Sequence, residues 1–212
     1  MRRAIYITNL IYSLFFYSVI PTNAQSSPNV GIGVGVAFPT GQALKSTYDL
    51  GYFFSLDSRV MHLTDDITIS PSFIYQRFSN TITSDVHEIL NSYHIGAQFD
   101  YNIPLKDDNS VLFYPMVGLF YERSTDDIEA DKGGNYEIFD ACGLNYTFGF
   151  GLTSRTIGIE VFYLLNNNKA TPSTNVVDDL SAQGLLTKES TFSMSTLMLC
   201  VKYHFDLLGG YN

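Results

Sequence analysis

The feature that most limits the folds open to this chain is an alternation of side-chain type, repeated in eight segments of roughly ten residues. In each segment one alternate set is apolar or aromatic and the other is small or polar, the period of a β-strand with two different faces. Turn-forming residues separate the segments, which cover residues 29–38, 49–62, 67–78, 92–103, 111–123, 140–153, 156–165 and 191–206. The alternation therefore predicts an all-β protein of eight strands.

The stretch NVGIGVGVAFPTG, residues 29–41, contains the first segment and invites comparison with a phosphate-binding loop. A dinucleotide fingerprint, G-x-G-x-x-G, would need a third glycine at position 36, where Val36 stands. The residues after the segment form a turn and not a helix start. We therefore interpret Gly31, Gly33 and Gly35 as one face of a strand, and no cofactor is expected.

The connections between the segments alternate in length. Short turns follow the second, fourth and sixth segments, whereas about ten, thirteen, sixteen and twenty-five residues follow the first, third, fifth and seventh. A secreted β-sandwich has no reason to sort its loops in this way, but outer-membrane barrels do. The pattern predicts an eight-stranded antiparallel up-and-down transmembrane β-barrel with short periplasmic turns and long extracellular loops.

The N-terminus indicates export. Arg2 and Arg3 precede an apolar run over residues 11–20 and a small-residue site at Ala24. This order predicts a cleaved signal peptide, residues 1–24, because the run is shorter than the roughly 20 residues a membrane-anchoring helix needs. Residues 25–212 are then a single barrel domain, and the expected location is the cell outer membrane.

The charge of the chain narrows the choice of partners. Removing Arg2 and Arg3 shifts the formal net charge of −9 by two units, to −11, and no basic patch balances it. Nucleic acid is therefore not expected as a partner. The expected partners are outer-membrane lipid and lipopolysaccharide, an envelope protein, and the barrel-assembly machinery during biogenesis.

Taken together, the signal peptide, the GIGVGVAFPTG opening, the eight amphipathic segments and the closing VKYHF resemble small Bacteroidota-type outer-membrane β-barrel proteins, PorT-like in the broad sense. The resemblance spans nearly all of residues 25–212. It implies the fold and the compartment, and it implies no catalytic residues.

Five charged residues fall on the inward-facing phase: Asp57, Arg59, Asp100, Glu160 and Lys202. The last four lie near the periplasmic ends of their strands. An eight-stranded barrel is only wide enough for side chains to fill, so the inward set should form a packed polar core. At one level of the lumen, opposite charges would avoid isolated burial. We favour a structural plug over an ion path or proton relay, and a narrow passive channel would need an open lumen.

Ser92, His94 and Glu122 share the inward phase near the extracellular rim of neighbouring segments. A nucleophile, a base and an orienting carboxylate of this kind would suit an outer-membrane lipid hydrolase. No nucleophile elbow or oxyanion motif accompanies them, and a polar rim produces such trios by chance. We therefore do not expect an enzyme.

Alternate acidic residues in the third long connection, Asp127, Glu129 and Asp131, resemble half of a calcium-binding loop. Gly133 falls one place late, and Ile138 stands where the loop requires glutamate. A solvated acidic loop is the expected structure, with a weak divalent-cation site as the alternative.

The two cysteines, Cys142 and Cys200, would by number alone suggest a disulfide. Their phases place Cys142 on the outer face and Cys200 on the inner face, with the seventh strand between them. We expect two free thiols.

Overall fold

The computed structural model describes residues 29–59, 61–64, 66–84, 86–106, 110–130, 134–154, 156–166, 168–172, 190–191 and 193–206. Its elements are β1 (Asn29–Pro39), α2 (Gln42–Thr47), β2 (Gly51–Arg59), β3 (Met61–His62), β4 (Ile67–Thr83), β5 (Val86–Tyr101), β6 (Ile103–Pro104), β7 (Val111–Ala130), β8 (Gly134–Ser154), β9 (Ile157–Leu165), β10 (Lys169–Pro172), β11 (Ser190–Thr191) and β12 (Thr196–Asp206). The proposed signal peptide, residues 1–24, lies outside the described residues.

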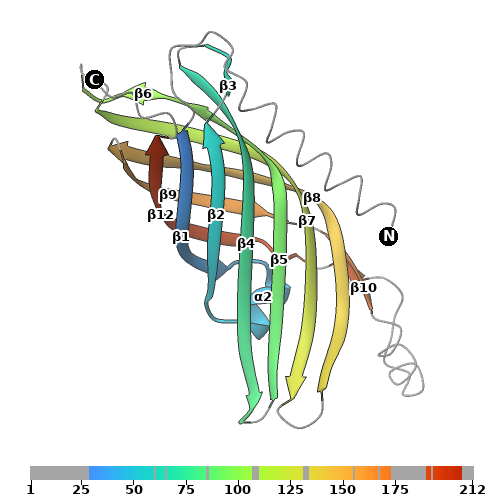
Figure 1. Cartoon of the computed structure of the whole chain (residues 1–212). Helices are drawn as coiled ribbons and strands as arrows, with labels where there is room; N and C mark the ends of the chain where they lie inside the picture. Colours follow the sequence, from blue (N-terminus) through green and yellow to red (C-terminus); the bar gives the residue numbers. More distant parts are fainter. Residues whose placement is uncertain are drawn as a thin grey trace.

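Eight of these strands close into an antiparallel barrel, as the alternation predicted (Figure 1). Around the ring the order is β1, β2, β4, β5, β7, β8, β9 and β12. Closure is made by β1, which pairs with β2 on one side and β12 on the other, so that Gly33 lies opposite both Ser55 and Lys202. The first and last strands therefore leave no open sheet edge between them.

The outer wall is a belt of exposed apolar and aromatic side chains. On β1, for example, Val34 is 59% exposed whereas its neighbour Gly33 faces the lumen and is buried. The belt continues around the ring through residues that include Phe54, Ile95, Val117, Phe148, Ile159 and Val201. A continuous apolar surface of this size on a closed barrel is the surface of a membrane-spanning protein. Among the described residues, no helix is long and apolar enough to cross a membrane.

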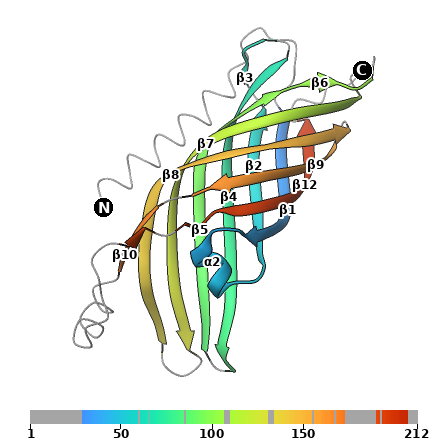
Figure 2. The same cartoon turned by 180° about the vertical axis from the view of Figure 1, so that it is seen from behind.

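Four neighbouring strands are much longer than the rest. The strands β4, β5, β7 and β8 have 17, 16, 20 and 21 residues, whereas β1, β2, β9 and β12 have 9 to 11. The extra lengths project from one end of the barrel as two β-hairpins, β4–β5 and β7–β8, here called the ribbons (Figures 1 and 2). We call this end of the barrel the ribbon end and the opposite end the short-turn end.

The ribbons correct the expectation that residues 79–91 and 124–139 are long loops. Ser79 pairs with Ile89 in the first ribbon, and Asp127 pairs with Glu137 in the second. These stretches lack a continuous apolar face because they lie beyond the belt, so they lack the period by which a half-buried strand is recognised. The first long connection also holds an unexpected helix, α2, which lies at the ribbon end beside β1 and β12 (Figure 2). Most of the fourth, residues 173–189, lies outside the described part of the chain.

Candidate functional site

Lys202 of β12 lies between two carboxylates in the short-turn half of the lumen. Its Nζ is 2.6 Å from Asp57 Oδ2 and 2.7 Å from Glu160 Oε1. All three side chains are buried, so the ammonium compensates two charges that would be costly alone. The structure thus brings together three of the five charged residues singled out from the sequence.

The other two, Arg59 and Asp100, lie beside this group. Arg59 Nε is 4.0 Å from Asp100 Oδ2, and the guanidinium carbon lies 4.7 Å from the centre of the Tyr114 ring. Tyr114 donates a 2.8 Å hydrogen bond to Glu160 Oε1, and Gln98 donates one of 2.7 Å to Asp100. We call Asp57, Arg59, Asp100, Glu160 and Lys202 the charge layer. The sequence analysis missed Tyr114, although its inward phase in the segment 111–123 was the available signal.

The glycines of β1 leave the space in which the Asp57 and Lys202 side chains meet. A Cβ on Gly31 would lie 2.7 Å from Asp57 Oδ1 and 3.0 Å from Lys202 Cδ, and one on Gly33 would lie 2.6 Å from Cys200 Sγ. Because β1 separates β2 from β12, the Asp57 and Lys202 side chains meet above the β1 backbone. A larger residue on this face of β1 would push them apart.

Between the charge layer and the ribbon end, large apolar side chains occupy much of the lumen. The rings of Phe53 and Phe162 meet edge to face, with centroids 5.8 Å apart. The same buried cluster includes Ile74, Phe120, Leu164 and Met198. This corrects the expectation of a polar core throughout, because the inward positions halfway along the barrel are filled by large apolar side chains. Large apolar side chains packed across the lumen in this way oppose the passage of ions.

A second polar group lies above the apolar layer, centred on Glu122 of β7. Its carboxylate accepts hydrogen bonds from the hydroxyl of Ser124 and from the amides of Asn145, Asn166 and Asn168, the last at 2.8 Å. The sequence analysis missed the three asparagines. Asn166 and Asn168 stand two apart in an Asn run, a spacing that places both on one side of an extended chain.

The trio Ser92, His94 and Glu122 is close in space but is not arranged for catalysis. Ser92 Oγ is 2.7 Å from Ser124 Oγ, and His94 Nδ1 is 3.9 Å from Glu122 Oε2, beyond hydrogen-bond reach. Ser92, His94 and Glu122 are at most 3% exposed. The described residues therefore give Ser92 neither a base nor access to a lipid substrate.

The first long connection covers the ribbon end of the lumen. Leu44 and Tyr48 are buried, and the Tyr48 ring lies 5.7 Å from the Phe78 ring between centroids. The Tyr48 hydroxyl donates a 2.9 Å hydrogen bond to Asp126 Oδ1 on the ribbon, beyond the apolar belt. Burial, reinforced by the nearby Glu88 carboxylate, raises the pKa of Asp126 to about 7.

Two of the acidic residues of the third connection, Asp127 and Glu129, lie on the ribbon strand β7. Asp127 is opposite Ile89 and Glu129 is opposite His87, while Asp131 lies outside the described residues. Within the part of the chain that the structure describes, no three His, Cys, Asp or Glu side chains are grouped to hold a metal ion. The divalent-cation alternative therefore stays a prediction.

Both cysteines are free thiols, as the strand phases predicted. Cys142 is exposed on the outer face of β8, and Cys200 is buried on the lumen side of β12.

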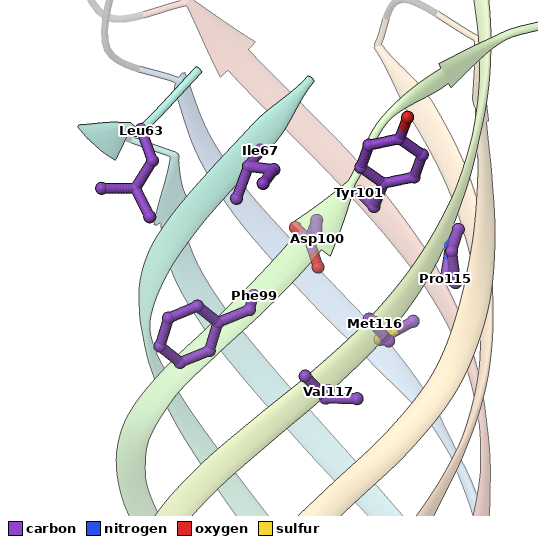
Figure 3. A pocket seen from close by; sticks show the side chains of 8 residues that line it. All are labelled: Leu63, Ile67, Phe99, Asp100, Tyr101, Pro115, Met116 and Val117. Carbon is purple, nitrogen blue, oxygen red and sulfur yellow. The ribbon is translucent and has the colours of Figure 1, made fainter. Parts of the chain in front are cut away.

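The outer wall has a hollow of about 480 Å³ near the short-turn end, between β5 and β7 (Figure 3). Its lining residues are Leu63, Ile67, Phe99, Asp100, Tyr101, Pro115, Met116 and Val117. Pairing between β5 and β7 ends at Asp100 and Met116, next to Pro115, which has no amide hydrogen to donate. The lining is apolar apart from Asp100, so the hollow suits hydrocarbon and offers no catalytic group.

Comparison with known proteins identifies the class of fold. No protein-family model and no curated protein sequence matches the chain. It is similar in structure to Ail, the attachment invasion locus protein of Yersinia pestis, with a TM-score of 0.50 and 15% identity over 85% of this chain and 100% of that chain. Neisserial surface protein A, NspA, gives 0.48 and 14% over 85% and 98%, and OprG from Pseudomonas aeruginosa gives 0.47 and 14% over 85% and 96%.

The fold shared with Ail and the apolar belt together define the class. The chain is an integral β-barrel protein of the outer membrane, with eight strands that cross the membrane. In such barrels the short turns face the periplasm and the long connections face outward.

Proposed function

We propose that this protein acts through the outer surface of its barrel and through its two ribbons, as a structural or partner-binding component of the cell envelope. The observation that carries the proposal is the filled lumen. The charge layer, the apolar layer and the Glu122 group occupy successive levels, and Tyr48 covers the ribbon end. A barrel filled in this way presents only its outside to other molecules.

The lengths of the ribbon strands support the same proposal. A tilted strand crosses the hydrocarbon in about 9–11 residues. Residues 124–130 of β7 lie beyond the belt, and at about 3.3 Å per residue they extend the ribbon roughly 20 Å along its own direction past the membrane. A ribbon of that length places backbone and polar side chains where an extracellular molecule or a neighbouring envelope protein can contact them.

The partners we propose are outer-membrane lipid, lipopolysaccharide and an envelope protein, with the barrel-assembly machinery acting during insertion. Export through a signal peptide in residues 1–24 and a PorT-like relationship are parts of this proposal. The name of Ail, attachment invasion locus protein, describes a contact role for a protein of the same fold. A contact role suits a filled barrel, since contact needs no open lumen.

Display of the ribbons can be tested by cysteine labelling in intact cells, in a Cys142→Ser background that removes the exposed native thiol. A cysteine at Thr81, near the tip of the first ribbon, should react with a membrane-impermeant maleimide. A cysteine at Thr64, in a short turn, should react only after the outer membrane is permeabilised. Labelling at Thr64 and not at Thr81 in intact cells would reverse the orientation and overturn the proposal.

The role of the ribbons can be tested by shortening them. Removing matched residues beyond the row Phe78, Leu90, Asp126 and Phe139 keeps the pairing registers of all four strands, the belt and the contacts of Tyr48. We expect the shortened protein to insert and resist heat as a folded barrel, but to lose the envelope protein recovered by cross-linking to the full-length chain. Unchanged cross-linking to that protein would show that the ribbons do not carry the contact.

A further inference from the structure

The outer wall changes from apolar to polar at matching register positions on four neighbouring strands. The pairing registers align two successive outward-facing rows across β4, β5, β7 and β8. The row nearer the membrane centre consists of Tyr75, Tyr93, Arg123 and Cys142, and the next row consists of Arg77, Asn91, Thr125 and Asp140. Tyrosines concentrate at the membrane–water interface, so these rows mark the outer-leaflet interface.

A groove of about 450 Å³ crosses this interface between β5 and β7. It is lined by Tyr93, Ile95, Tyr121, Arg123 and Thr125, and we call it the rim groove. Its membrane end is formed by Ile95 and the Tyr121 ring, and its aqueous end by Arg123 and Thr125. The apolar end of the groove therefore lies at the depth of the acyl chains of a lipid. Its cationic end lies at the depth of an anionic headgroup.

Two cations lie at and beside the rim groove, and the carboxylates Asp127 and Glu129 follow further along β7. Among the described side chains on the outer wall at the ribbon end, the cations are Arg77 and Arg123, one row apart and two strands apart. At the ends of β1, β2 and β12 nearest the ribbons, the outward side chains are Phe38, Tyr52 and Leu197. In a chain of net charge −9, this local pair of cations is complementary to a phosphate.

We propose that the rim groove and Arg77 bind a phosphorylated lipid of the outer leaflet. Arg123 and Arg77 contact a phosphate group, and an acyl chain lies along Ile95 and Tyr121. Guanidinium groups suit phosphate because their planar donors match two of its oxygens. The inference rests on the outer-membrane placement and extends the proposed contact with lipopolysaccharide to a particular site.

Asp140 forms an ion pair with Arg123 at the rim groove. Arg123 Nη2 is 3.0 Å and Nε is 3.3 Å from the Asp140 carboxylate, and the side chains are 64% and 40% exposed. An ion pair this exposed contributes little free energy, so a lipid phosphate can compete with Asp140 for the guanidinium. Removing the Asp140 charge should therefore strengthen lipid binding, whereas removing the arginine charges should weaken it.

The test is retention of lipid by the refolded full chain in native mass spectrometry, with bisphosphorylated lipid A and dephosphorylated lipid A as probes. The Arg77→Gln, Arg123→Gln double variant should retain at least about tenfold less bisphosphorylated lipid A than the wild type, as expected when charged hydrogen bonds are lost. Asp140→Asn should retain more. Lys45→Gln, which removes an exposed cation on α2 away from the groove, should behave as wild type.

Three outcomes would overturn the inference: equal retention of the two lipids by the wild type, unchanged retention by the double variant, or displacement of lipid A by an equal concentration of inorganic phosphate. Heat-modifiable gel mobility checks that each variant is folded. The proposed function is tested separately, because maleimide labelling of the ribbons does not depend on lipid retention.

Discussion

At the scale of single residues, Lys202 shows how far sequence reasoning reaches. Its inward phase and its distance from the strand end could be predicted, and so could its place at one level of the lumen with Glu160. The contact with Asp57 was not, because it passes over the backbone of β1 and depends on the absence of side chains at Gly31 and Gly33. Strand phase reports which side chains share a level, but not which of them meet.

Replacing Lys202 should therefore destabilise the barrel. Lys202→Met leaves two buried carboxylates without their shared cation, at a cost of roughly 3–5 kcal/mol. The urea midpoint of unfolding in lipid vesicles should fall clearly. Neutralising both partners in the same chain, with Asp57→Asn and Glu160→Gln, should restore much of the loss, and Lys45→Met serves as the control. A Lys202→Met midpoint equal to that of the wild type would show that the ammonium is not needed to compensate the two carboxylates.

The glycine face of β1 gives a second residue-scale prediction. Gly33→Ala places a methyl group against Ser55 Oγ and Cys200 Sγ and should destabilise the fold by about 1–3 kcal/mol, the usual range for overpacking. Gly158→Ala is the matched control, since its nearest neighbour is His204 Nε2 at 3.3 Å. The measurement is again the urea midpoint. Equal effects of the two alanines would mean that the space above Gly33 is not limiting.

At the scale of elements, the eight barrel strands were predictable and the ribbons and α2 were not. A membrane-spanning strand has one face in lipid and one face in the lumen. Its apolar and polar side chains therefore alternate along the sequence with a period of two. Residues 79–91 and 124–139 lie beyond the belt and have no such contrast, although they pair as strands. The helix α2 is only six residues long, and it is held by Tyr48 and Leu44 through contacts with distant strands.

The attachment of α2 to the ribbon should depend on pH. Folding raises the pKa of Asp126 from 3.8 to about 7, chiefly by burial and then through the nearby Glu88 and Asp127 carboxylates. A raised folded-state pKa means that the folded form favours the protonated carboxyl. Its contribution to stability is complete below about pH 4 and is lost as the pH rises through about 7.

Amide hydrogen exchange can measure this effect at Lys45 and Tyr48, whose N–H groups bond within the α2 segment. After correction for intrinsic exchange, their protection should decrease between pH 5 and pH 8. In Asp126→Asn the carboxyl is absent, so the protection should stay level over the same range. The same pH slope in both proteins would assign the effect to another group.

At the scale of the whole molecule, the lumen of the barrel is filled by side chains at successive levels. The charge layer, the apolar layer and the Glu122 group each come from different strands, yet together they occupy the lumen from the short-turn end to the ribbon end. Strand phase places the five residues of the charge layer on the inward face. It does not mark the apolar layer, because the inward Phe53 has an outward aromatic neighbour, Phe54, so the two faces do not differ in side-chain type there.

Conductance in a planar lipid bilayer tests the filled lumen most directly. The refolded protein should insert without stable current steps. Ions would have to pass the packed apolar side chains and the paired charges of the charge layer. Insertion can be verified independently by heat-modifiable mobility of the same preparation. Reproducible ohmic steps from the wild-type protein would show an open pore and would contradict the account.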